Sequence, residues 1–206
     1  FQGIPRDMVK VGNIDAIRDY VEALKFEPAL LVWYLMDEPS IQKVSPEILR
    51  KVNNIVKATD PNHPTFVVFS EKTTNVNLYN DSYDIAGFDP YPIKGQKGKV
   101  DMVRKVIEER KNQVLGIFPV WHVVQSHDFR KPKSGVYYPT PNQIRCMVFL
   151  GIIAQARGTC YYWWPSSICD ILQFPNVWAS IQETNYDLRN LEYILTAKDS
   201  VPDVIH

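Results

Sequence analysis

The chain has 206 residues, of which 45% are hydrophobic and 12% aromatic, and its 23 basic and 23 acidic residues give a formal net charge of zero. This composition supplies enough apolar side chains for a core and excludes a disordered chain. The balanced charge, with no basic stripe, argues against nucleic acid or an anionic membrane as partner and favours a neutral ligand.

The sequence predicts neither a membrane segment nor a bound cofactor. The longest apolar runs, such as 147–154, are shorter than the roughly 20 residues of a membrane-spanning helix, and no signal peptide is visible. Three cysteines and four histidines lack metal-ligand spacing, and no glycine-rich phosphate loop is present. Residues 1–12 are interpreted as a lead-in, in which Phe1-Gln2-Gly3 could be the remnant of a protease tag site.

Helical and strand patterns alternate along the chain. Asn13 and Ser45-Pro46 are typical helix starts, and Thr140-Pro141-Asn142-Gln143 has the pattern of a capping box with proline at the first helical position. The predicted elements, in chain order, are a helix over 13–25, a strand over 29–36, a helix over 45–59, strands over 65–69 and 83–88, a helix over 99–113, a strand over 115–124, a helix over 140–157, a strand over 159–164 and a helix over 175–197.

Five strands that each alternate with a helix, and that are apolar along most of their length, indicate a parallel sheet buried on both faces. The pattern suits the later part of an eight-stranded TIM (β/α)8 barrel, about strands four to eight, because such barrels need about 250 residues. We therefore expect a partial barrel domain over 13–197, a linker over 198–206 and additional domains beyond the ends of this chain. An open α/β domain of another function is the alternative.

Several of the predicted strands end in acidic residues. The run 30–36 ends in Asp37-Glu38-Pro39, which places two adjacent carboxylates at a strand tip, because proline does not extend the ladder. The next two strands are followed by Glu71 and Asp89. The carboxyl ends of barrel strands are where such enzymes hold their catalytic groups.

These segments resemble the large clan of retaining β-glycosidases with (β/α)8 barrels. Residues 33–39 are similar to that clan's fourth-strand acid motif, and 83–92, 119–121 and 161–164 to its sixth, seventh and eighth strands. The resemblance covers about 13–197. It implies a carbohydrate substrate, β-linked sugars and a secreted or cell-surface location, and it implies Glu38 as general acid/base. The clan's usual asparagine is replaced by Asp37, whose charge would raise the proton affinity of Glu38.

The resemblance leaves the second carboxyl unassigned. Where the clan has its glutamate nucleophile, this chain has Gln125, and a neutral amide cannot form the glycosyl ester. Asp128, Asp89 and Glu71 are the alternatives. The remaining substrate-binding candidates, besides Asp37, Asp89, Gln125 and Asp128, are Tyr91 and the strand-eight aromatics Trp163 and Trp164, one of which should face the mouth and stack on a sugar.

Two functions follow from these residues. The first is hydrolysis of β-linked sugars with Glu38 as proton donor. The second is an inactive barrel that binds glycan or serves as a scaffold, in which Gln125 marks the loss of the nucleophile. An enzyme needs two carboxyls facing each other across the mouth, whereas a binder needs aromatic and amide groups.

Overall fold

The computed structural model of the chain describes residues 1–73, 75–94, 98–114, 116–127, 138–162, 171 and 174–197. The elements, in chain order, are β1 (Gln2–Gly3), α1 (Arg6–Val11), α2 (Ile14–Leu24), β2 (Trp33–Asp37), α3 (Pro46–Thr59), β3 (Thr65–Ser70), the 3₁₀ helix η1 (Val76–Ser82), β4 (Ile85–Asp89), α4 (Met102–Gln113), β5 (Val120–Gln125), α5 (Pro141–Ile153), β6 (Gly158–Tyr162) and α6 (Pro175–Leu195).

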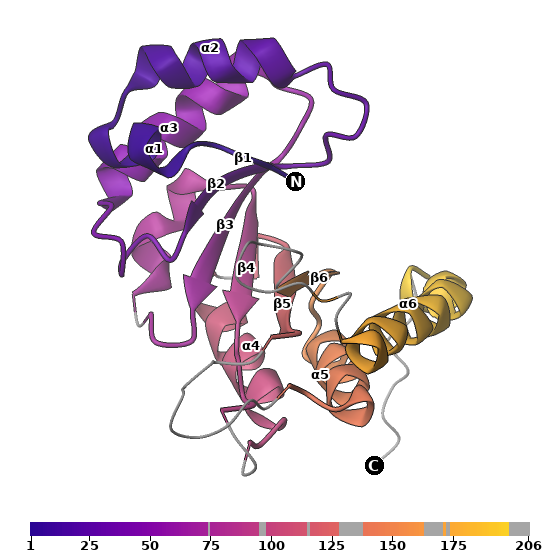
Figure 1. Cartoon of the computed structure of the whole chain (residues 1–206). Coiled ribbons are helices and arrows are strands. Elements are labelled where there is room, and N and C mark those ends of the chain that lie inside the picture. The colour runs from indigo at the N-terminus through magenta and orange to yellow at the C-terminus, as the bar shows by residue number, and fades with distance from the viewer. Residues whose placement is uncertain are drawn as a thin grey trace.

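The six strands form one parallel sheet in chain order, from β1 to β6. The sheet curves into a half-barrel, and helices connect consecutive strands along its outer side (Figure 1). Parallel neighbours need such crossover connections, which explains the regular alternation of strand and helix. The α/β class and the parallel pairing predicted from the sequence are confirmed.

Local sequence explains where three of the helices begin. The side chain of Asn13 accepts a hydrogen bond from the backbone of Ala16, and Ser45 caps α3 ahead of Pro46. At α5 the side chains of Thr140 and Gln143 each bond the other's backbone, which is the predicted capping box. These contacts satisfy amide groups that a helix leaves free in its first turn.

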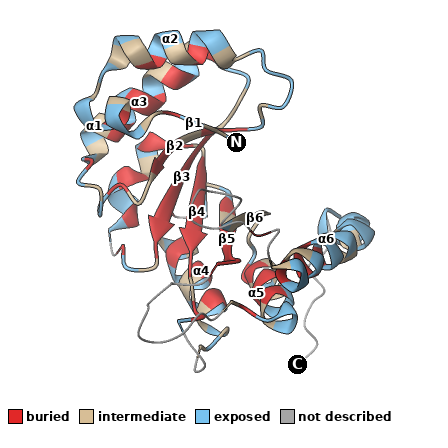
Figure 2. Cartoon of the chain, in the orientation of Figure 1, coloured by how far each residue is buried: buried red, intermediate tan, exposed pale blue. Residues whose placement is uncertain are grey.

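Alternation along the strands separates two apolar layers. Outward side chains such as Trp33 and Phe69 join the helices in the main core, while Phe66, Val68 and Val123 belong to a smaller cluster on the inner, concave face. The strands are largely buried, and the helices keep an exposed outer side (Figure 2). At Gly87 a Cβ atom would lie 2.6 Å from the Phe66 ring, so glycine is what lets this ring cover the inner face.

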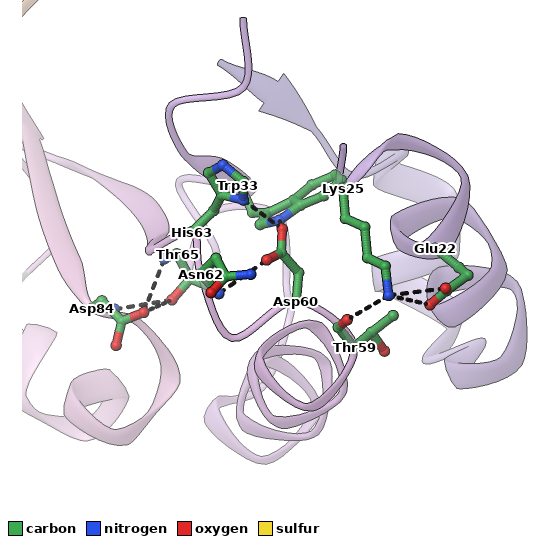
Figure 3. A network of polar contacts seen from close by, with 9 residues as sticks. All are labelled: Glu22, Lys25, Trp33, Thr59, Asp60, Asn62, His63, Thr65 and Asp84. Atoms are coloured by element: carbon green, nitrogen blue, oxygen red, sulfur yellow. Dashed lines mark hydrogen bonds and ion pairs between the residues drawn. The ribbon is translucent and has the colours of Figure 1, made fainter. Parts of the chain in front are cut away.

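A polar network closes the amino-terminal edge of the sheet (Figure 3). Asp60, which is 1% exposed, accepts hydrogen bonds from Trp33 Nε1 at 2.8 Å and from the backbone of Asn62 at 3.0 Å, and His63 Nδ1 lies 2.7 Å from it. Asp84 similarly accepts from the backbone and hydroxyl of Thr65. The network therefore fixes the starts of β2 and β3.

The structure contains elements that the sequence pattern did not predict. Gln2–Gly3 pair with Trp33 and Tyr34 as β1, α1 precedes the first predicted helix, and η1 precedes β4. The proposed linker, 198–206, lies outside the described residues. Among the residues that the structure describes, no helix is long and apolar enough to cross a bilayer.

Candidate functional site at the carboxyl ends of the strands

Because all strands are parallel, their carboxyl ends meet at one edge of the half-barrel. There, Asp37 ends β2, Ser70 ends β3 and Asp89 ends β4, while Gln125 and Tyr162 end β5 and β6. Ser70 is in register with Asp89, and Gln125 with Tyr162. The edge therefore gathers most of the predicted site residues that the structure describes.

A bulge in β2 determines which carboxylate faces the concave side. The register shifts between Tyr34 and Met36, so that Tyr34 pairs with Phe66 and Asp37 with Val68, both inner-face residues. The hydroxyl of Tyr34 donates a 2.8 Å hydrogen bond to Asp37 Oδ1. Simple alternation would place residues 34 and 37 on opposite faces, so the sequence pattern alone did not predict this contact.

Glu38 follows directly, with a backbone that non-glycine residues rarely adopt. Its φ is 44°, and its amide donates to the Val68 carbonyl at 2.8 Å. Burial raises the pKa of Glu38, and the charges of Asp37 and Glu71 raise it further, against a hydrogen bond from Ser70 and the charge of Lys72. A strained, half-buried carboxyl with raised proton affinity fits a general acid.

Asp89 is the most deeply buried carboxyl of this edge. It is 6% exposed, and Oδ1 has no hydrogen-bond partner among the described residues. Burial is the main cause that raises its pKa to about 8, followed by the charges of Glu38, Asp37 and Glu71. At neutral pH this side chain is therefore mostly a carboxylic acid.

Glu71 is engaged in fixing the loop after β4. Its carboxylate accepts from the backbone amide of Tyr91 at 3.3 Å and pairs with Lys94. From the outer layer, the buried Arg110 of α4 donates to the Glu71 carbonyl at 2.9 Å. A carboxylate held in this way serves as an anchor for Tyr91 and its loop.

Gln125 is fully buried and holds the same loop. Its Oε1 accepts from the amide of Ile93 at 2.8 Å, and Nε2 donates to the Ile93 carbonyl at 2.8 Å and to the His127 carbonyl at 3.1 Å. Both amide hydrogens are thus used within the protein. In this arrangement the residue at the expected nucleophile position acts as a structural clamp.

Three aromatic rings pack together at the same strand ends as the carboxyl groups. Tyr91 stacks on Tyr162 with ring centroids 5.7 Å apart, and His127 meets both rings edge-on at 4.8 and 5.1 Å. The neighbouring concave face opens into a cavity of 590 Å³, lined among others by Tyr34, Phe66, Tyr162 and Trp178. Flat apolar rings beside hydrogen-bonding groups are what a sugar-binding cleft requires.

Three of the predicted site residues are not placed. Asp128, Trp163 and Trp164 lie outside the described residues. Sequence reasoning missed the parts played by Tyr34 and His127, although the aromatic content of the strand ends pointed to this region. Within the described ranges, no group of three or more His, Cys, Asp or Glu side chains could hold a metal ion.

No protein-family model matches the sequence, and no curated protein matches it. Solved structures do match. A Bacteroides thetaiotaomicron protein assigned as an α-L-fucosidase has a TM-score of 0.61 at 14% identity, over 82% of this chain and 61% of its own. A Marinomonas ef1 β-galactosidase has a TM-score of 0.67 at 9% identity, over 89% of this chain and 43% of its own. A Halorubrum lacusprofundi β-galactosidase has a TM-score of 0.59 at 11% identity, over 75% of this chain and 36% of its own.

The likeness to these structures establishes a glycosidase-like fold. This chain spans 61%, 43% and 36% of the three relatives, so it corresponds to only a part of each. Fold is shared among proteins of different activity, and the substrates named for these relatives are properties of those proteins.

Proposed function

We propose that this chain is part of a glycoside hydrolase-like barrel that binds β-linked sugars at the carboxyl ends of its strands, with Glu38 as general acid/base. The observation that carries the proposal is Glu38 itself, half-buried at a strand tip with a raised pKa and a left-handed backbone. The glycosidase folds of the structural relatives support the substrate class.

Within this proposal, β2 corresponds to the fourth strand of an eight-stranded barrel, and β1 to the third. The sugar would lie against Tyr91 and Tyr162 and contact Asp37. Trp163, Trp164 and Asp128 remain candidates for the same cleft, and a location outside the cell and further domains remain expectations. The candidate for the second carboxyl is Asp128, because Glu71 is paired with Lys94 and the buried Asp89 is mostly a neutral acid at pH 7.

A second candidate function is an inactive barrel that binds glycan. The observation that favours it is Gln125, which occupies the expected nucleophile position and uses its amide to hold Ile93. Such a protein would bind sugars through the aromatic rings at the strand ends without cleaving them.

Assays of the full-length protein against a panel of chromogenic glycosides distinguish the two functions. In Glu38→Gln the shape is kept and the proton donor is removed, so hydrolysis should fall by about 10²–10⁴-fold with sugar affinity largely retained. Glu27→Gln, an exposed glutamate after α2, is the matched control and should behave like the wild type. Sugar binding without hydrolysis by the wild type would establish the inactive barrel instead.

A further inference from the structure

Four carboxyl groups lie at neighbouring strand ends, and they differ in how they are compensated. Glu71 pairs with Lys94, Asp37 accepts from Tyr34, and Glu38 accepts from Ser70. Asp89 is the exception, because its buried Oδ1 has no hydrogen-bond partner in the described part of the chain. The carboxyl accepts a hydrogen bond from its own backbone amide, but burial outweighs this bond, and a buried carboxylate compensated so little is destabilised relative to the neutral acid.

The position of Asp89 in the sheet explains why its ionised form is destabilised. By alternation along β4 it shares the inner face with Ile85 and Gly87, and it is in register with Ser70, the residue that contacts Glu38. Neighbouring strands are about 4.8 Å apart, so Asp89 lies two strands, on the order of 10 Å in the backbone, from Glu38. Their side chains reach into the same concave space.

We propose that Asp89 is a positioning residue of the proposed sugar site, which lies there as a neutral carboxylic acid and limits the negative charge around Glu38. The inference rests on the function proposed for Glu38. If Asp89 ionised, a further charge in a poorly solvated space would raise the proton affinity of Glu38 and repel Asp37. The neutral form instead supplies an O–H donor at the mouth.

Groups from every packed element bear on this protonation. Burial raises the pKa of Asp89 to about 8, and most of the surrounding groups are acidic or phenolic. The groups that face Asp89 or its acidic neighbours are Tyr34 and Asp37 of β2, Glu38 directly after β2, Glu71 and Lys72 after β3, Tyr91 and Lys94 after β4, and Tyr162 of β6.

Infrared titration of the full-length protein tests the charge state without any substrate. The carbonyl band of a protonated carboxylic acid should be present at pH 7, should disappear with a midpoint near pH 8, and should be clearly weaker in Asp89→Asn. Asp15→Asn, an exposed aspartate on α2, should leave the band unchanged. A wild type without this band at pH 7, or a band of undiminished intensity in Asp89→Asn, would overturn the proposal.

A second variant keeps the test decisive if Asp89→Asn does not fold. Glu38→Gln removes a neighbouring charge, and the midpoint of the Asp89 band should then move to lower pH. An unchanged midpoint would show that the two groups are not coupled and would overturn the inference. Because this readout is spectroscopic, it is independent of whether Glu38 cleaves sugars.

The pH dependence of the site links the inference to function. Sugar binding, or hydrolysis where it occurs, should decline in the wild type above a pH of about 8, and the pH profile of Asp89→Asn should lack this decline whatever its value at pH 7. A decline that is identical in both proteins would contradict the role of Asp89. Loss of hydrolysis in Glu38→Gln is judged separately and tests the proposed function alone.

Discussion

Gln125 joins the end of β5 to Ile93 through two hydrogen bonds of 2.8 Å, one to the amide nitrogen and one to the carbonyl oxygen of that residue. Among the described residues, no other side chain of β5 forms two hydrogen bonds with one residue of the loop after β4. The contact explains why an amide suits this position, since it both donates and accepts.

Gln125→Glu should therefore destabilise the protein instead of creating a nucleophile. An ionised carboxylate cannot donate to the carbonyls of Ile93 and His127, and it would be fully buried. We expect the free energy of unfolding to fall by about 1–3 kcal/mol or more, measured by urea denaturation at pH 7.

The exposed Gln182 of α6 provides the matched control, because Gln182→Glu makes the same chemical change where water solvates the charge. This control should unfold within about 0.5 kcal/mol of the wild type. Hydrolysis gained by Gln125→Glu with unchanged stability would show that the residue is a displaced catalytic position and not a clamp.

Asp60 should make the free energy of unfolding decrease as the pH falls into the acid range. Burial alone would raise the pKa of Asp60, but hydrogen bonds from Trp33, His63 and the Asn62 amide outweigh it and lower the pKa. A depressed folded-state pKa stabilises the fold above the unfolded value of about 3.9, and this stabilisation is lost as pH falls through the folded-state pKa.

Asp60→Asn should accordingly lower the free energy of unfolding by about 1–3 kcal/mol at pH 7, and the difference from the wild type should shrink as pH falls below about 4. Equilibrium unfolding at several pH values measures this. Asp15→Asn changes an aspartate whose side chain is 85% exposed and should show a small, nearly constant difference. If the difference in unfolding free energy between the wild type and Asp60→Asn did not shrink at acid pH, the ionisation of Asp60 would not be coupled to folding.

Gly151→Ala should disturb the contact between α5 and β5. A Cβ atom at this position would lie 2.6 Å from Nδ1 of the fully buried His122. The ring cannot give way easily in a close-packed layer, so we expect a loss of about 1–3 kcal/mol in unfolding free energy.

Gly3→Ala is the comparison for this variant, since a Cβ there meets nothing within 4 Å. Thermal unfolding of both proteins should show the loss only in Gly151→Ala. If adding a smaller residue at position 122 to Gly151→Ala did not recover part of the stability, the clash with His122 would not be its cause.

Much of the fold could be predicted because its signals are local. Ser45-Pro46 and the Thr140 capping box depend on residues three positions apart, and both are present as expected. The two-residue strand β1 could not be predicted, because its pairing depends on β2 more than 30 residues later and two residues carry no periodicity.

The site was only partly predictable for the same reason. Asp37 and Glu38 follow from the strand and its proline, but the contact between Tyr34 and Asp37 depends on a bulge, and Gln125 finds its partner 32 residues away in the sequence. Tertiary contacts of this kind leave no periodic pattern in the sequence. They determine which polar residue is free to contact a substrate and which one holds a loop in place.

The backbone of Glu38 exchanges stability for the placement of a carboxyl group. A left-handed conformation is nearly free for glycine but costs of order 1–3 kcal/mol for a residue with a side chain. Glycine at this position would relax the chain and remove the acid in the same step. Selection for thermostability alone would therefore act against the residue on which the proposed chemistry depends.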